Sequence, residues 1–104
     1  MMSSESIIFN YNCRIMLINL MIETKIEDYD VWLREGFRKD SERRSKMCNE
    51  SKTRVAKVSD SEAIILLFDV DIDRLRQHMH DPVMKLLESQ FKASHVIHTF
   101  SPID

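Results

Sequence analysis

Ala63-Ile64-Ile65-Leu66-Leu67-Phe68 is a run of six residues without a single polar side chain. Successive side chains of a β-strand point to opposite faces of the sheet, so a strand built from this run is apolar on both faces. A sheet with one face in water would instead alternate apolar and polar residues. The run therefore predicts a central strand whose two faces both have to be covered.

The composition describes one folded domain. The chain has 104 residues, of which 43% are hydrophobic and 31% charged, with a net charge of −2. These values are typical of a globular domain rather than of a disordered segment. The single glycine, Gly36, excludes the glycine-rich loops that bind phosphate in P-loop and Rossmann proteins.

Basic side chains gather between residues 34 and 54, where 8 basic and 4 acidic residues occur. Such a stripe is typical either of nucleic-acid binding or of the solvated side of a helix, and we prefer the helix. RNA-binding RRM domains of related topology carry exposed aromatic residues on the third strand, where this chain has Ile and Leu and only a terminal Phe68. We expect no nucleic-acid partner.

The two cysteines, Cys13 and Cys48, fit neither a disulfide framework nor a zinc signature. The apolar run at residues 15–22 is too short for a membrane span and lacks the cleavage site of a leader peptide. The sequence therefore predicts a cytoplasmic protein with no membrane partner.

Hydrophobic periodicity gives the order of the elements. Residues 1–13 are an extension, either loose or an edge strand at residues 6–9, and residues 14–104 form one domain. The predicted strands cover residues 14–23, 53–58, 63–68 and 94–100, and the predicted helices cover residues 29–47 and 72–91, the second restarting at Asp81-Pro82. Thr24 or Asp28 is the expected N-cap of the first helix, and Gly36 on its apolar stripe predicts a close approach to the sheet.

The order β-α-β-β-α-β predicts an α+β, ferredoxin-like fold, in which a four-stranded antiparallel sheet carries two helices on one face. The other face would then expose an apolar patch larger than the few hundred Å² that monomers tolerate. Two copies packed sheet to sheet would cover it, so we expect a homodimer.

Four short motifs then resemble the dimeric α/β-barrel superfamily. They are Tyr29-Asp30-Val31-Trp32, Arg43-Arg44, Leu67-Phe68-Asp69 and Asp81-Pro82. The chain is most similar to small proteins, many of them uncharacterised, grouped with the antibiotic-biosynthesis monooxygenases. The resemblance implies two ferredoxin-like sheets forming an α/β barrel, with a ligand pocket between the sheet and the helices of each subunit. Some members are cofactor-free oxygenases.

Other members of the superfamily degrade haem with an Asn on the first strand and a Trp and a His on the second helix. By this resemblance Asn19 matches the Asn, whereas His78 and Glu88 stand where the Trp and the His would be. One match of three does not support haem degradation, and we expect no cofactor.

Asn19 and His78 are the candidate catalytic residues. Asn19 is the polar side chain within the first strand, and it either hydrogen-bonds a substrate or O2 or is satisfied by neighbouring backbone. His78 and His80 flank the helix break at Asp81, where either a His–Asp general base or a solvated or capping role fits the pattern.

The candidate pocket residues are Trp32, Tyr29, Phe37, Met79 and His98. The aromatic members either form the floor of a pocket or pack in the core. His95 and His98 lie three apart on a strand and therefore point to opposite faces, so one of them faces the pocket or the barrel.

No metal site is expected. Asp69, Asp71 and Asp73 begin like a calcium-binding loop, but its sixth and twelfth positions are Arg74 and His80 instead of Gly and Glu. Carboxylates ahead of a helix are explained by the positive end of its dipole.

The function expected from the sequence is binding of a small apolar or aromatic molecule between sheet and helices by a homodimeric α/β-barrel protein. The alternatives are a cofactor-independent monooxygenase and a structural or regulatory dimer without a ligand. A cavity of roughly 300 Å³ or more, with Asn19 or a histidine projecting into it, would favour the enzyme.

Overall fold

The computed structural model describes residues 17–101. The expectations for residues 1–13, and for the first three residues of the strand predicted at 14–23, lie outside the described residues. The strands are β2 (Leu17–Lys25), β3 (Arg54–Ser59), β4 (Glu62–Asp71) and β5 (Ser94–Phe100). The helices are α2 (Tyr29–Val31), η1 (Trp32–Phe37), η2 (Arg38–Asp40), α3 (Ser41–Ser45), η3 (Glu50–Lys52), α4 (Ile72–His80) and α5 (Pro82–Phe91).

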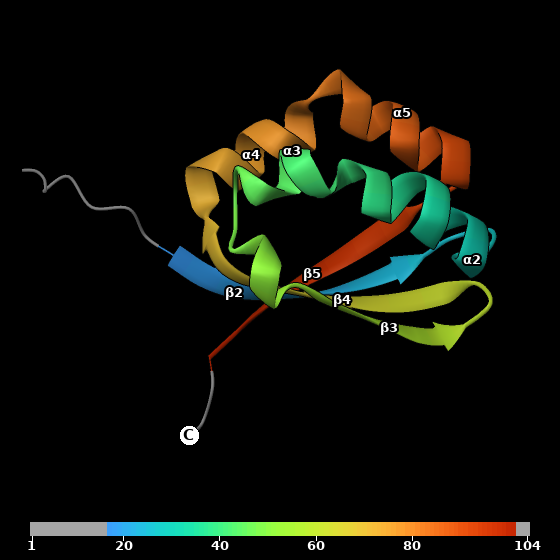
Figure 1. The fold of residues 1–104 in the computed structure, drawn as a ribbon, viewed down its shortest axis with the longest axis horizontal. Coiled ribbons are helices and arrows are strands. Elements are labelled where there is room, and N and C mark those ends of the chain that lie inside the picture. Colours follow the sequence, from blue (N-terminus) through green and yellow to red (C-terminus); the bar gives the residue numbers. More distant parts are fainter. Residues whose placement is uncertain (1–16, 102–104) are drawn as a thin grey trace, which may run out of the picture.

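The four strands form one open antiparallel sheet in the order β3-β4-β2-β5. Figure 1 shows the α2–α3 and α4–α5 segments together on one side of this sheet. The predicted α+β class and four-stranded antiparallel sheet are therefore confirmed, and the strand order is compatible with a ferredoxin-like fold. Within residues 17–101, no helix is long and apolar enough to cross a membrane.

The side chains of β4 divide between the two faces as expected for a central strand. Ala63, Ile65 and Leu67 are buried under the helices, whereas the intervening residues are half-buried. The core continues from these residues to Trp32 and Phe91 on the helices. The helix-covered face thus contains the main core, and the other face has no helix over it among the described residues (Figure 1).

A β-bulge extends β4 beyond its predicted end at Phe68. Ile18 pairs with Val70 and Leu20 with Leu67, so that Phe68 and Asp69 together oppose Asn19. Asp69 has a φ of 55°, in the left-handed region. The extra residue returns the Val70 side chain to the core, where it is fully buried.

The first helical stretch runs from Tyr29 to Ser45, close to the prediction, but its hydrogen bonding changes along its length. Asp28 is the N-cap, its Oδ1 accepting from the Val31 N–H at 3.1 Å. η1 is π-helical and η2 is a 3₁₀ turn. Gly36 lies within η1, and a Cβ there would meet Phe91 Cε2 at 2.8 Å. The predicted approach of Gly36 to the sheet is therefore wrong, because the close neighbour is the ring of α5.

The predicted break in the second helix is confirmed. Asp81 is the N-cap of α5, its Oδ1 accepting from the Val83 N–H at 2.9 Å, and Pro82 takes the first helical position. α5 ends at Phe91, and its C-cap is Lys92, a non-glycine residue with a φ of 53° in the left-handed region.

Candidate functional site

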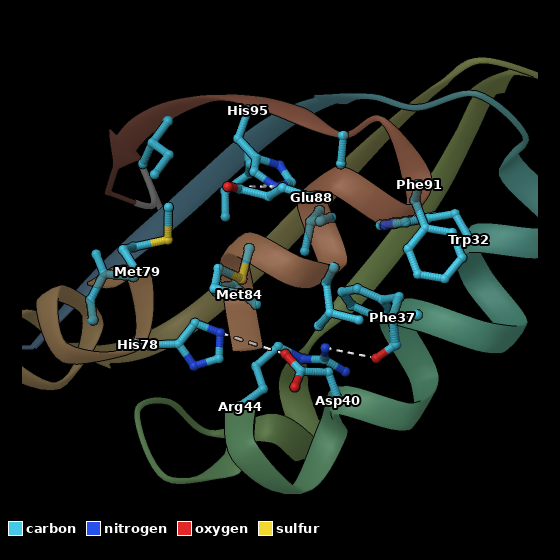
Figure 2. A pocket seen from close by; sticks show the side chains of 18 of the residues that line it. Trp32, Phe37, Asp40, Arg44, His78, Met79, Met84, Glu88, Phe91 and His95 are labelled. Carbon is cyan, nitrogen blue, oxygen red and sulfur yellow. Dashed lines mark hydrogen bonds and ion pairs between the residues drawn. The ribbon is translucent and has the colours of Figure 1, made fainter. Parts of the chain in front are cut away.

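An apolar cavity of about 80 Å³ lies between the sheet and the helices. Its walls come from both helical segments and from three strands, as Figure 2 shows from close by. The lining consists of Ile22, Trp32, Gly36, Phe37, Asp40, Arg44, Met47, Ile65, Leu67, Leu75, His78, Met79, Met84, Leu87, Glu88, Phe91, Ala93, His95 and Ile97. Ile97 is 40% exposed, so this part of the wall reaches the surface.

The π-helical segment η1 forms one wall. Its wider turn brings Trp32, Gly36 and Phe37 to the cavity together, and the Trp32 and Phe37 rings lie 5.2 Å apart. π-helical turns inside helices occur frequently at functional sites, because they turn side chains away from the regular helical positions.

Arg44 lies under the aromatic wall and is 5% exposed. Its Nη1 donates to the Phe37 carbonyl at 2.9 Å, and its guanidinium carbon lies 3.7 Å from the centre of the Phe37 ring. Its Nη2 donates to Glu50 Oε2 at 2.7 Å. The charge is thus paired, and its main effect on the cavity is to fix Phe37.

His78 faces Asp40 on one side of the cavity (Figure 2), with Nε2 3.5 Å from Asp40 Oδ2. Asp40 also accepts from Arg43 Nη1 at 2.6 Å. Burial, and then the nearby Arg43 charge, lower the pKa of His78. A neutral imidazole of this kind can accept a proton from a bound molecule.

His95 and Glu88 face each other on another side of the same cavity (Figure 2). The hydroxyl oxygen of Thr24 lies 3.1 Å from His95 Nδ1, and Glu88 Oε2 lies 3.8 Å from His95 Nε2. Burial is also the main cause of the lowered pKa of His95. The cavity therefore has two imidazoles, each next to a carboxylate.

Four of the candidate catalytic and pocket residues line the cavity: Trp32, Phe37, Met79 and His78. Tyr29 is buried in the core beside Trp32, at 5.8 Å between ring centres, and is not part of the lining. Its place in the structure matches the alternative of core packing.

His98 and Asn19 also lie outside the lining. His98 occupies the uncovered face, where its Nε2 is 2.7 Å from Glu23 Oε2, and the structure has His95 in the cavity instead. Asn19 Oδ1 accepts from the Asp69 backbone N–H at 3.2 Å, across the bulge. This contact is the backbone alternative considered for Asn19.

Sequence reasoning missed Asp40 and Glu88 as lining residues, and it left His95 and His98 as alternatives for the histidine that faces the pocket or the barrel. A signal existed for His95, because it alternates with Ile97 along β5 and both therefore share a face. No pattern in the sequence placed Asp40 or Glu88 in the cavity, since acidic residues are common on the solvent-facing side of helices. Among residues 17–101, no group of three or more His, Cys, Asp or Glu side chains is arranged to hold a metal ion.

Comparison of the chain with protein-family models, with curated proteins and with solved structures gives no match.

Proposed function

We propose that this protein binds a small apolar molecule in the cavity between its sheet and helices. The observation that carries the proposal is the cavity itself, with aromatic and aliphatic walls and two histidine–carboxylate pairs. Its volume of about 80 Å³ is below the roughly 300 Å³ of drug-sized pockets, so the ligand is small. Met79 and Met84 lie in the wall, and their unbranched side chains can rearrange around a guest.

Titration with toluene, followed by amide NMR, tests this proposal. We expect shifts concentrated on residues 32–37 and 84–97, two segments that carry about half of the lining residues. Leu87→Phe should reduce the affinity because Leu87 is in the lining, whereas Leu86→Phe, on the exposed side of the same helix, should not. Shifts confined to the uncovered sheet face, or equal effects of the two variants, would overturn the proposal.

We infer further that the working unit is a ferredoxin-like homodimer that forms an α/β barrel. The strand order supports the subunit fold, and the apolar side chains of the uncovered face support the pairing. That face presents Ile64, Leu66 and Phe68 from β4, and the Phe68 ring meets Phe100 edge-on at 5.8 Å between centres. A cytoplasmic location, expected from the cysteine content, belongs to the same proposal.

Sedimentation equilibrium measures the pairing. The wild type should behave as a dimer at micromolar concentration, and Leu66→Glu should give a folded single copy. Leu86→Glu, which adds the same charge on α5, is the matched control and should remain dimeric. A monomeric wild type would remove the dimer while leaving the cavity proposal intact.

A cofactor-independent monooxygenase is the second candidate, favoured by the buried neutral imidazole of His78 beside Asp40. That imidazole can act as a base toward an acidic C–H or O–H of a substrate. The small cavity weighs against it. Oxygen uptake with a panel of phenols that is lost in His78→Gln would support the enzyme, and absence of uptake would leave binding as the function.

A further inference from the structure

The Nε2 atom of His95 is buried and has no hydrogen-bond partner within the described part of the chain. It faces Glu88 Oε2 at 3.8 Å, which is too long for a hydrogen bond. A buried polar atom without a partner is uncommon in folded proteins and requires a physical reason. Here the atom belongs to a residue in the cavity wall, where a bound molecule could supply the partner.

The Thr24 hydroxyl is compatible with either tautomer of His95, and the Glu88 carboxylate near Nε2 determines which one is favoured. Thr24 Oγ1 lies 3.1 Å from Nδ1, and its hydroxyl can donate to that nitrogen. Nε2 then carries the hydrogen, which is directed toward the negative Glu88 side chain. The opposite tautomer would set a nitrogen lone pair against the carboxylate, and is disfavoured.

An N–H donor and a carboxylate acceptor therefore stand 3.8 Å apart at one side of an apolar cavity. One oxygen atom about 2.8 Å from each would satisfy both at ordinary hydrogen-bond lengths. A hydroxyl group has the required chemistry, since its oxygen accepts from Nε2–H while its hydrogen is donated to Glu88. A ligand carboxylate would be repelled by Glu88, and an ammonium group could not accept from His95.

We infer that His95 and Glu88 form a hydroxyl-binding subsite, so that the ligand is a small apolar compound carrying one hydroxyl group. The inference rests on the proposed function, because the apolar body of the ligand must occupy the cavity. The same subsite accepts an alcohol or a phenol. A bridging water without a ligand is the competing occupant of this position.

The experiment compares compounds of equal shape with and without the hydroxyl. Dissociation constants for phenol and toluene, and for cyclohexanol and methylcyclohexane, are measured by NMR titration of the wild type and His95→Phe. The phenylalanine keeps an aromatic ring but removes the donor. We expect the hydroxyl compound of at least one pair to lose about tenfold in affinity relative to its hydrocarbon in His95→Phe. The pair that responds identifies an aromatic or an aliphatic ligand body.

Glu88→Gln provides a second variant that keeps the side-chain shape, and it should lower the same ratio. Glu27→Gln is the control, because Glu27 pairs with Lys92 on the surface. One outcome is that both hydrocarbons bind while the affinity of each hydroxyl compound relative to its hydrocarbon is the same in the wild type and in the variants. In that case the subsite holds only water, and the hydroxyl inference fails while the proposed function stands. If neither hydrocarbons nor hydroxyl compounds bind the wild type, the proposed function fails with it.

Discussion

Arg44 donates two roughly parallel hydrogen bonds to the carboxylate of Glu50, from Nε to Oε1 at 2.9 Å and from Nη2 to Oε2 at 2.7 Å. The same guanidinium lies over the Phe37 ring and binds the Phe37 carbonyl. The Phe37 carbonyl lies at the junction between π-helical η1 and the 3₁₀ turn η2. The backbone hydrogen-bonding pattern changes there, so carbonyl groups at the junction can lack the partner that a regular helix would provide. The ion pair therefore stabilises the irregular helix that forms the cavity wall.

Arg44→Ala should lower the free energy of unfolding by about 3 kcal/mol, because it leaves the Glu50 carboxylate without its cationic partner and uncovers Phe37. Chemical denaturation monitored by Trp32 fluorescence measures this loss. Arg44→Lys retains the charge but not the two-pronged contact, and should have an intermediate effect. Equal stability of Arg44→Lys and wild type would contradict the importance of the paired geometry.

Gly36→Ala should destabilise the protein by about 1 kcal/mol, although alanine is the better helix former. The added Cβ would lie 2.8 Å from Phe91 Cε2, closer than carbon atoms approach in folded proteins. In a Phe91→Leu background the ring is gone, and the same substitution should cost less. A double-mutant cycle in thermal unfolding gives the coupling, and complete additivity would show that Phe91 is not the obstacle.

The elements with strong local signals were predictable from the sequence. The apolar stripe from Tyr29 to Phe37 and the Asp81-Pro82 restart depend on periodicity and capping, which neighbouring residues determine. The π-helical form of η1 was not predictable in this way, because periodicity and capping do not distinguish it from a regular α-helix; in the structure η1 contacts Arg44 of α3 and lies against Phe91 of α5.

Which polar side chains reach the cavity also depends on long-range contacts, here the register in which the strands pair. Sequence alternation separates His95 from His98, but only the pairing of β5 with β2 determines which one lies under the helices. For Asn19 the sequence likewise left two alternatives, a ligand contact or a backbone partner, and the bulge at Asp69 supplies the backbone partner. Long-range pairing therefore decided which polar side chains reach the cavity.

Asn19→Ala should lower stability by about 1 kcal/mol without changing the affinity for toluene, because Asn19 satisfies the Asp69 N–H and lies outside the lining. Urea denaturation and the NMR titration together measure the two effects. Loss of ligand binding at unchanged stability would indicate instead that Asn19 contacts the ligand.

Lys92→Gly should raise the free energy of unfolding by about 1 kcal/mol, because glycine adopts the left-handed C-cap conformation without steric cost. The lysine contributes little through its exposed ion pair with Glu27, at 3.5 Å. Lys92→Ala removes that pair without the conformational gain and is the matched control. Thermal unfolding of the two variants should differ, with only the glycine variant above wild type.

Acidification should destabilise the protein through His78 and His95. Burial lowers the pKa of both imidazoles below the ordinary 6.5, so between that value and the lowered pKa values the unfolded chain binds more protons than the folded one. Their contribution is complete above pH 6.5 and is lost as the pH falls through the folded-state pKa values. Most carboxylates titrate at lower pH, so the histidines dominate this window.

Urea unfolding at about pH 7.5 and about pH 5.5 measures the difference, which should be smaller in a His78→Gln, His95→Gln double variant. His80→Gln is the control, since the His80 side chain is exposed and its loss should leave the dependence as in wild type. If the double variant keeps the full dependence, the two cavity imidazoles are not its source. If it loses the dependence, the two cavity imidazoles are its source.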